Sequence, residues 1–219
     1  MIKLFKKNKV NINSISIPKL DWNLDKNDKK IKQWINPEQT VALSVNFFEL
    51  KPDLPTISNI ANLRDFYRDQ ITAHNGGLVE VDKINLKGYD LIRTIFKIPQ
   101  EPTGMTYIAS LTIPFENYSY VVKIQAPEFG TTGMRDNVVA MKLLNEGKIS
   151  IGDNGYEGWF NDPYDSEIKE GVLMNISEEK KYDADFPNHP LTQARILLDK
   201  IESEIKFGDE LEKIGKFKK

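Results

Sequence analysis

Five stretches in the middle of the chain are rich in β-branched and aromatic residues, several of them alternating apolar with polar positions. We expect strands over 41–50, 78–86, 89–98, 105–113 and 118–126. Short connections such as Lys87-Gly88 separate the last four of these stretches. Such turns demand antiparallel pairing and leave no room for crossover helices. The pattern therefore predicts a meander of about five antiparallel strands.

Two flanking stretches have the period of three to four residues that is typical of amphipathic helices. The first begins after Ser58 or Asn59, which are good N-caps, and ends at Asn75-Gly76-Gly77, where a glycine can adopt the left-handed backbone of a C-cap. The second begins after Gly133 and ends at Gly147. We expect the apolar face of this second helix to be formed by Met134, Val138, Met141 and Leu143 or Leu144.

A third helix is predicted over 190–206, because Pro190 is preorganised for a first helical position and His189 or Asn188 can cap it. Its apolar positions are Leu191, Ala194, Leu198, Ile201 and Ile205. Full burial of these side chains contributes about 7–12 kcal/mol before entropy costs. We therefore predict an α+β fold in which two or three helices pack on an antiparallel sheet.

The domain organisation follows from the same patterns. Residues 1–38 are polar and rich in Lys and Asn, and we expect an N-terminal arm with an edge strand or extended stretch at 12–20 and a short helix at 31–35. Residues 39–219 form a single domain, whose length suffices for one core. The domain includes an irregular segment at 148–188, which is long enough to suggest a function or short hidden elements.

Composition narrows the functional classes. The formal charge of -2 offers no global field for nucleic acid, and the absence of cysteine removes disulfides and thiolate chemistry. No apolar run approaches a membrane span, and no apolar region follows the basic N-terminus. We expect a cytoplasmic protein, with attachment to an anionic membrane surface through Lys3, Lys6, Lys7 and Lys9 as an alternative.

Catalytic chemistry has few candidates. His74 lies near the end of the first helix, where an imidazole complements the helix dipole, and His189 lies before the helix-initiating Pro190. No nucleophile elbow accompanies either histidine. An alternative to a binding role is a small hydrolase or ligand-binding enzyme that uses His189 with Asp183 or Asp185.

Metal and phosphate sites are weakly indicated. Carboxylates gather in two sets, one of Asp183, Asp185 and His189 and the other of Asp153, Asp162 and Asp165. Neither set has the spacing of a calcium loop or a zinc site, and turn formation explains both. The loop 130–136 could present N–H groups to a phosphate, but it lacks the Gly-Lys-Ser/Thr of a P-loop, and a tight turn before a helix explains it better. We expect no cofactor and no metal.

Aromatic residues are concentrated in the irregular segment. Exposed aromatic side chains beside polar ones are typical of protein interfaces, whereas buried ones would hold the segment against the sheet. The candidates for a protein-binding site are Trp159, Phe160, Tyr164, Tyr182 and Phe186.

Several motifs resemble those of a family of uncharacterised bacterial proteins. They are GGLVEV at 76–81, RTIFK at 93–97, TGMTYIASLTIPF at 103–115, YVVK at 120–123, GTTGMRD at 130–136 and YDADFPNHPL at 182–191. The order of elements also resembles the PsbP-like fold, whose bacterial members include chaperones of secreted effectors. The second resemblance implies a binding role rather than catalysis. We therefore expect a non-enzymatic module that binds another protein, as an effector chaperone or an immunity partner.

Overall fold

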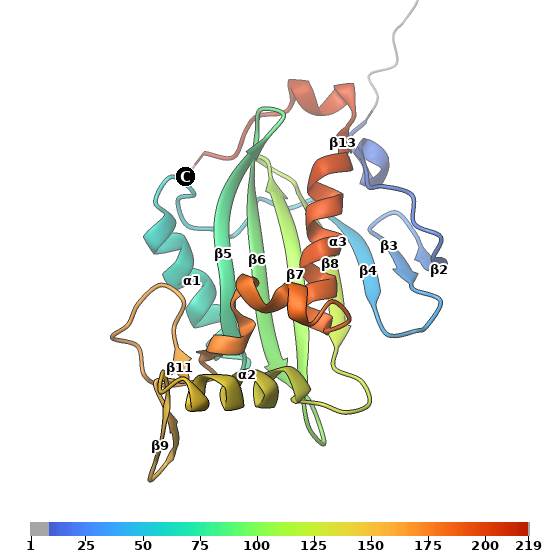
Figure 1. Ribbon diagram of the computed structural model, residues 1–219. Helices are drawn as coiled ribbons and strands as arrows, with labels where there is room; N and C mark the ends of the chain where they lie inside the picture. The colour runs from blue at the N-terminus through green and yellow to red at the C-terminus, as the bar shows by residue number, and fades with distance from the viewer. Residues whose placement is uncertain (1–8, 219) are drawn as a thin grey trace, which may run out of the picture.

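The centre of the molecule is a seven-stranded sheet in which every neighbouring pair of strands is antiparallel (Figure 1). The computed structural model describes residues 9–218. The strand order is β2 (Asn23–Asn27), β3 (Ile31–Ile35), β4 (Ala42–Phe48), β8 (Ser119–Pro127), β7 (Met105–Pro114), β6 (Tyr89–Pro99) and β5 (Gly77–Leu86). Strands β5 to β8 form the predicted meander, and β4 extends it as the fifth strand. The predicted α+β fold is confirmed.

Alternation along the strands divides the core between the two faces of the sheet. On β6, Leu91 and Ile95 belong to the larger core cluster, whereas the intervening Ile92 belongs to a smaller one on the opposite face. Helix α3 (Pro190–Glu204) covers the first face over β7 and β8. Helix α1 (Ile60–Thr72) covers the second face at the β5 edge.

Helix α3 follows the sequence prediction closely. All five predicted apolar side chains are completely buried against the sheet, and the helix begins at Pro190. The ring Nδ1 of His189 accepts a hydrogen bond from the backbone N–H of Leu191 at 3.2 Å, so this histidine is the N-cap. The cap and the apolar spacing are local features, which explains why the sequence predicts them.

Helix α1 begins after Asn59, whose side-chain oxygen accepts from the N–H groups of Ala61 and Asn62. The left-handed residue after the helix is Asn75, with φ of 56°, so the expectation of a glycine there is wrong. Gly77 is needed for a different reason. A Cβ atom at this position would lie 1.9 Å from the carbonyl oxygen of Val172, which means that only glycine allows this approach of the irregular segment.

Residues 9–38, within the predicted N-terminal arm, contribute strands to the sheet. The stretch 31–35, expected to be a helix, is strand β3 and pairs with both β2 and β4. Strand β2 is an edge strand, and all five of its residues are exposed. Its sequence therefore lacks the alternation of apolar and polar residues from which a strand can be predicted. Pairing with neighbouring strands, rather than local pattern, makes these residues part of the sheet.

Helix α2 (Met134–Asn145) lies across one end of the sheet (Figure 1). Of its predicted apolar face, Leu143 is buried as expected, but the other three residues lie on the side that faces solvent. Val139, Ala140 and Leu143 are buried, whereas Met134, Val138 and Met141 are exposed. The helix carries apolar side chains on two sides, so periodicity could not decide which side faces the core.

Short elements complete the chain. Three small antiparallel pairs are β1 (Ile15–Ser16) with β13 (Lys206–Phe207), β9 (Ser150–Gly152) with β10 (Gly155–Glu157), and β11 (Phe160–Asn161) with β12 (Met174–Asn175). The short 3₁₀ helices are η1 (Ile12–Ser14), η2 (Ile176–Glu178), η3 (Lys180–Asp185) and η4 (Asp209–Lys213). The irregular segment 148–188 therefore hides short strands and turns.

The described residues include no helix that is both long enough and apolar enough to cross a membrane. Three of the basic residues considered for membrane attachment, Lys3, Lys6 and Lys7, lie outside the described residues. The fourth, Lys9, has its amine 3.7 Å from the Glu49 carboxylate.

Candidate interaction surface

Two of the five aromatic candidates are buried. Trp159 is only 3 % exposed and Tyr182 is 6 % exposed, and both belong to a core cluster with Val139 and Leu143 of α2. Their surface is occupied by this packing and has little left to offer a partner. These two side chains instead hold α2 in place.

The other three aromatic candidates have different environments. The hydroxyl of Tyr164 accepts a hydrogen bond from the N–H of Val81 at 2.7 Å, and the Arg64 guanidinium lies 3.6 Å from its ring centroid. Phe186 is half-buried, with the Arg135 guanidinium 5.7 Å from its ring centroid. Phe160 alone among the five candidates is largely exposed, at 53 %. Trp159, Tyr182 and Phe186 therefore pack under α2, whereas Tyr164 packs against the cluster under α1.

The inner side of α2 is anchored by a buried arginine. The Arg135 side chain donates to the carbonyl oxygens of Ser177 and Glu179 at 2.7 and 3.2 Å and to the Asp183 carboxylate at 2.9 Å. Asp183 also pairs with Arg195 of α3 at 2.9 Å. Because a buried charge is tolerated only when it is paired and hydrogen-bonded, this network fixes which side of α2 faces inward.

The outer side of α2 is an apolar stripe in contact with solvent. Met134, Val138 and Met141 are 56 %, 52 % and 64 % exposed, and their spacing places them along one line of the helix. We call these three residues the α2 stripe. Phe129, which is 82 % exposed, lies just before α2 in the chain. The irregular segment after α2 adds three further exposed apolar side chains, namely Ile151, Tyr156 and Phe160.

Most exposed large apolar residues of the described chain are therefore gathered at α2 and its two ends. Figure 1 shows that α2, the β9–β10 hairpin and the loop after β8 all lie at the same end of the sheet. Single exposed apolar residues are ordinary, but a cluster of this kind marks an interaction site in soluble proteins. The remaining examples, such as Leu24 and Ile196, lie on other elements.

His189 does not meet the aspartates proposed as its partners. Asp183 is bound by Arg135, Arg195 and Thr192, and neither Asp183 nor Asp185 forms a hydrogen bond or ion pair with the imidazole. The carboxylate nearest the ring is that of Glu128, 3.4 Å from Nε2. Since Nδ1 accepts from Leu191, its lone pair is occupied, and the proton of the imidazole is on Nε2, facing Glu128. In this arrangement neither ring nitrogen of His189 is free to accept a proton.

Glu128 occupies the position that the sequence suggested for a phosphate. Its carboxylate accepts hydrogen bonds from the N–H groups of Met105 and Gly133 at 2.9 and 3.0 Å. Burial by itself raises the pKa of this carboxyl, but the hydrogen bonds from His189 and the two N–H groups lower the pKa below its ordinary value. The glycine loop before α2 therefore binds an anion of the chain itself.

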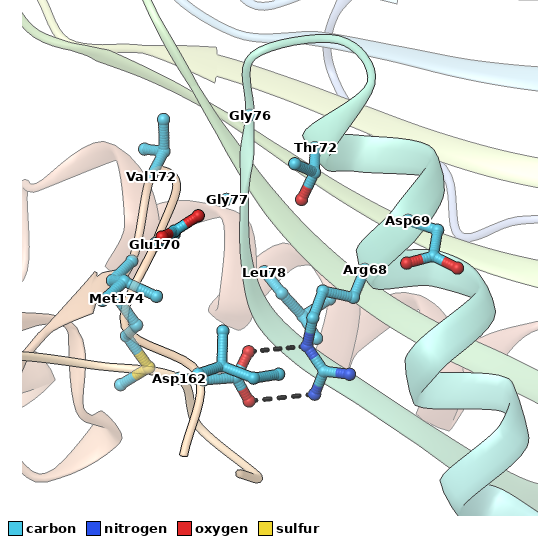
Figure 2. A pocket seen from close by; sticks show the side chains of 12 residues that line it. Arg68, Asp69, Thr72, Gly76, Gly77, Leu78, Asp162, Glu170, Val172 and Met174 are labelled. Atoms are coloured by element: carbon cyan, nitrogen blue, oxygen red, sulfur yellow. Dashed lines mark hydrogen bonds and ion pairs between the residues drawn. The ribbon is translucent and has the colours of Figure 1, made fainter. Parts of the chain in front are cut away.

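A cavity of about 310 Å³ lies between α1, the start of β5 and the irregular segment (Figure 2). Its charged centre is the Asp162 carboxylate, which receives two hydrogen bonds from Arg68 at 2.7 and 2.9 Å. The N–H groups of Tyr164 and Asp165 also donate to Asp162. These hydrogen bonds balance the charges of Arg68 and Asp162, so the ion pair holds the irregular segment against α1.

The remaining candidates are dispersed. Within residues 9–218, no cluster of three metal-ligating side chains occurs, so neither predicted carboxylate set comes together. Asp162 is paired with Arg68, and Asp165 accepts from the N–H of Glu167. His74 is exposed at the rim of an apolar groove between α1 and the sheet.

Comparison with known proteins finds solved structures of low sequence identity. No protein-family model and no curated protein matches this chain. The Ran-binding protein Mog1p of Saccharomyces cerevisiae has a TM-score of 0.46 at 10 % identity, with 90 % of this chain and 91 % of that chain covered. A cyanobacterial PsbP from Synechocystis has a TM-score of 0.34 at 9 % identity, with 66 % and 82 % covered. We take no function and no residue role from these likenesses.

Proposed function

We propose that this protein is a non-enzymatic module that binds another protein, and that the α2 stripe is its contact surface. The observation that carries the proposal is the exposure of Met134, Val138 and Met141 on a helix whose opposite side is already packed. Burying these side chains would remove apolar surface from water, at roughly 25 cal/mol per Å². This gain is a driving force for association.

The partner segment that fits this surface is an amphipathic helix. A line of apolar residues along a helix offers ridges into which a second helix can pack its own apolar face. Two of the three residues of the α2 stripe are methionines, whose flexible side chains adapt to different partner surfaces. This property suits a chaperone or immunity partner that shields an apolar segment of a secreted effector.

The proposal can be tested by photo-crosslinking followed by reconstitution. A photo-reactive amino acid replaces Lys142, which is exposed beside the α2 stripe, in the cells that make this protein. The captured protein is then purified and its affinity for this chain is measured by calorimetry. We expect the double substitution Val138→Asp and Met141→Asp to weaken binding at least about tenfold, because two charges would be desolvated.

The matched control is Ile196→Asp. Ile196 is also a large exposed side chain on a helix, at 55 %, but it lies on α3. We expect this variant to bind like the unaltered chain, and both variants to keep the melting temperature within a few degrees. Equal affinity of the α2 variant and the unaltered chain would refute the α2 stripe as the contact surface.

A further inference from the structure

A cavity of about 310 Å³ opens at the N-terminal end of the α2 stripe. Met134 belongs to both the stripe and the cavity, so a segment that lies along the stripe reaches the cavity without a gap. The apolar wall includes Phe129, Phe186 and Pro187. Its ionisable residues are Glu128, Arg135, Asp185 and His189.

Three of these four ionisable residues are already engaged. Arg135 has no exposed side-chain surface and is paired with Asp183 at 2.9 Å. Glu128 accepts two backbone hydrogen bonds and faces the Nε2 of His189. These groups satisfy one another, so they present little unbalanced charge to a ligand.

Asp185 is different. Its side chain is exposed, and within residues 9–218 no hydrogen bond or ion pair engages its carboxylate. The only exposed formal charge among the lining residues is therefore negative, and the same cavity is lined by Phe129 and Phe186. Aromatic faces attract cations, and a carboxylate offers a guanidinium two acceptor oxygens. This combination is complementary to a basic side chain.

Resting on the proposed function, we propose that this cavity receives an arginine or lysine side chain of the partner protein. The partner is then an amphipathic helix whose apolar residues lie on the α2 stripe and whose basic residue enters beside Asp185. The apolar contact supplies affinity, and the basic residue determines the direction in which the partner helix lies. A partner with an acidic residue at that position is rejected by Asp185.

The cavity can be tested separately from the stripe with small probes. Butylguanidinium, n-butanol and butyrate are titrated against the ¹⁵N-labelled protein, and the amide signals of Phe129, Asp185 and Phe186 are followed by NMR. We expect butylguanidinium to bind in a saturable manner, and its affinity to fall about threefold to tenfold in Asp185→Asn and at high salt. Asp165→Asn, an exposed carboxylate elsewhere, should leave the affinity unchanged.

Several results would overturn the inference. Butanol binding as tightly as butylguanidinium would show that the cavity takes an apolar side chain. Tighter binding of butyrate would show the opposite charge preference. Absence of any saturable shift, or equal affinity in Asp185→Asn, would show that the cavity does not recognise a cation.

The reconstituted complex then separates this inference from the proposed function. Asp185→Asn should weaken partner binding about threefold to tenfold, and replacing the partner's basic residue by glutamine should remove this difference. If the α2 stripe variant weakens binding but Asp185→Asn does not, the cavity inference fails and the proposed function stands. If neither variant weakens binding, both fail.

Discussion

Two adjacent residues of the irregular segment, Trp159 and Phe160, lie in opposite environments. Trp159 packs in the core under α2, and Phe160 faces solvent. Trp159 lies in the bend before β11, whereas Phe160 is the first residue of that strand, and the two side chains lie in different environments. The aromatic candidates therefore cannot be treated as one surface, because each residue's environment follows from its position on the backbone.

This difference gives a prediction for a matched pair of variants. Trp159→Ala should lower the free energy of unfolding by about 3–5 kcal/mol, because it removes a large buried side chain and leaves a cavity. Phe160→Ala should change it by no more than about 0.5 kcal/mol. Urea unfolding at neutral pH measures both values. Similar losses in the two variants would contradict the assignment of Trp159 to the core.

At the scale of elements, the irregular segment 148–188 is a support for α2. One side of the segment is fastened to α1 by the pair of Arg68 and Asp162, and the other side packs under α2. Burial by itself raises the pKa of the Asp162 carboxyl, but Arg68 and the N–H groups of Tyr164 and Asp165 hold the pKa below its ordinary value.

The lowered pKa of Asp162 predicts a pH dependence of stability. An acid whose pKa is lower in the folded state stabilises the fold above its unfolded pKa of about 3.9, and this contribution is lost as pH falls through the folded pKa. Asp162→Asn should cost about 1–3 kcal/mol at pH 7 and flatten the decline in stability below about pH 4. Asp165→Asn serves as the control in urea unfolding at several pH values. An unchanged acid profile in Asp162→Asn would contradict the role of this pair.

At the scale of the whole molecule, the N-terminal residues complete both the sheet and its core. Val10, Ile12 and Ile15 are buried in the larger cluster, and Trp34 of β3 packs against it. The hydroxyl of Tyr120 donates to the carbonyl oxygen of Asn11 at 2.7 Å. Residues 9–38 are therefore part of the same structural unit as the meander.

A truncation tests this conclusion. The chain 39–219, which follows the boundary expected from the sequence, lacks β2 and β3 and exposes β4 as a new edge. We expect this fragment to have a much lower melting temperature or to aggregate, because a long apolar edge strand is a template for pairing with other chains. The fragment 9–219 is the control. Cooperative unfolding of 39–219 at an unchanged temperature would show that the arm is dispensable.

The sequence by itself determined the meander, the start of α1 and the buried face of α3. These features depend on contacts between residues close in the chain: the tight turn at Lys87-Gly88, the cap at Asn59, and the spacing from Leu191 to Ile205.

Only the tertiary structure decided the membership of β2 and β3 in the sheet, the placing of Glu128 beside His189, and the side of α2 that faces solvent. Each of these depends on partners far away in the sequence. Helix α2 shows the reason most clearly: both of its sides carry apolar residues, and the buried pairing of Arg135 with Asp183 fixes which of them faces inward. The candidate surface is the side that this pairing leaves outside.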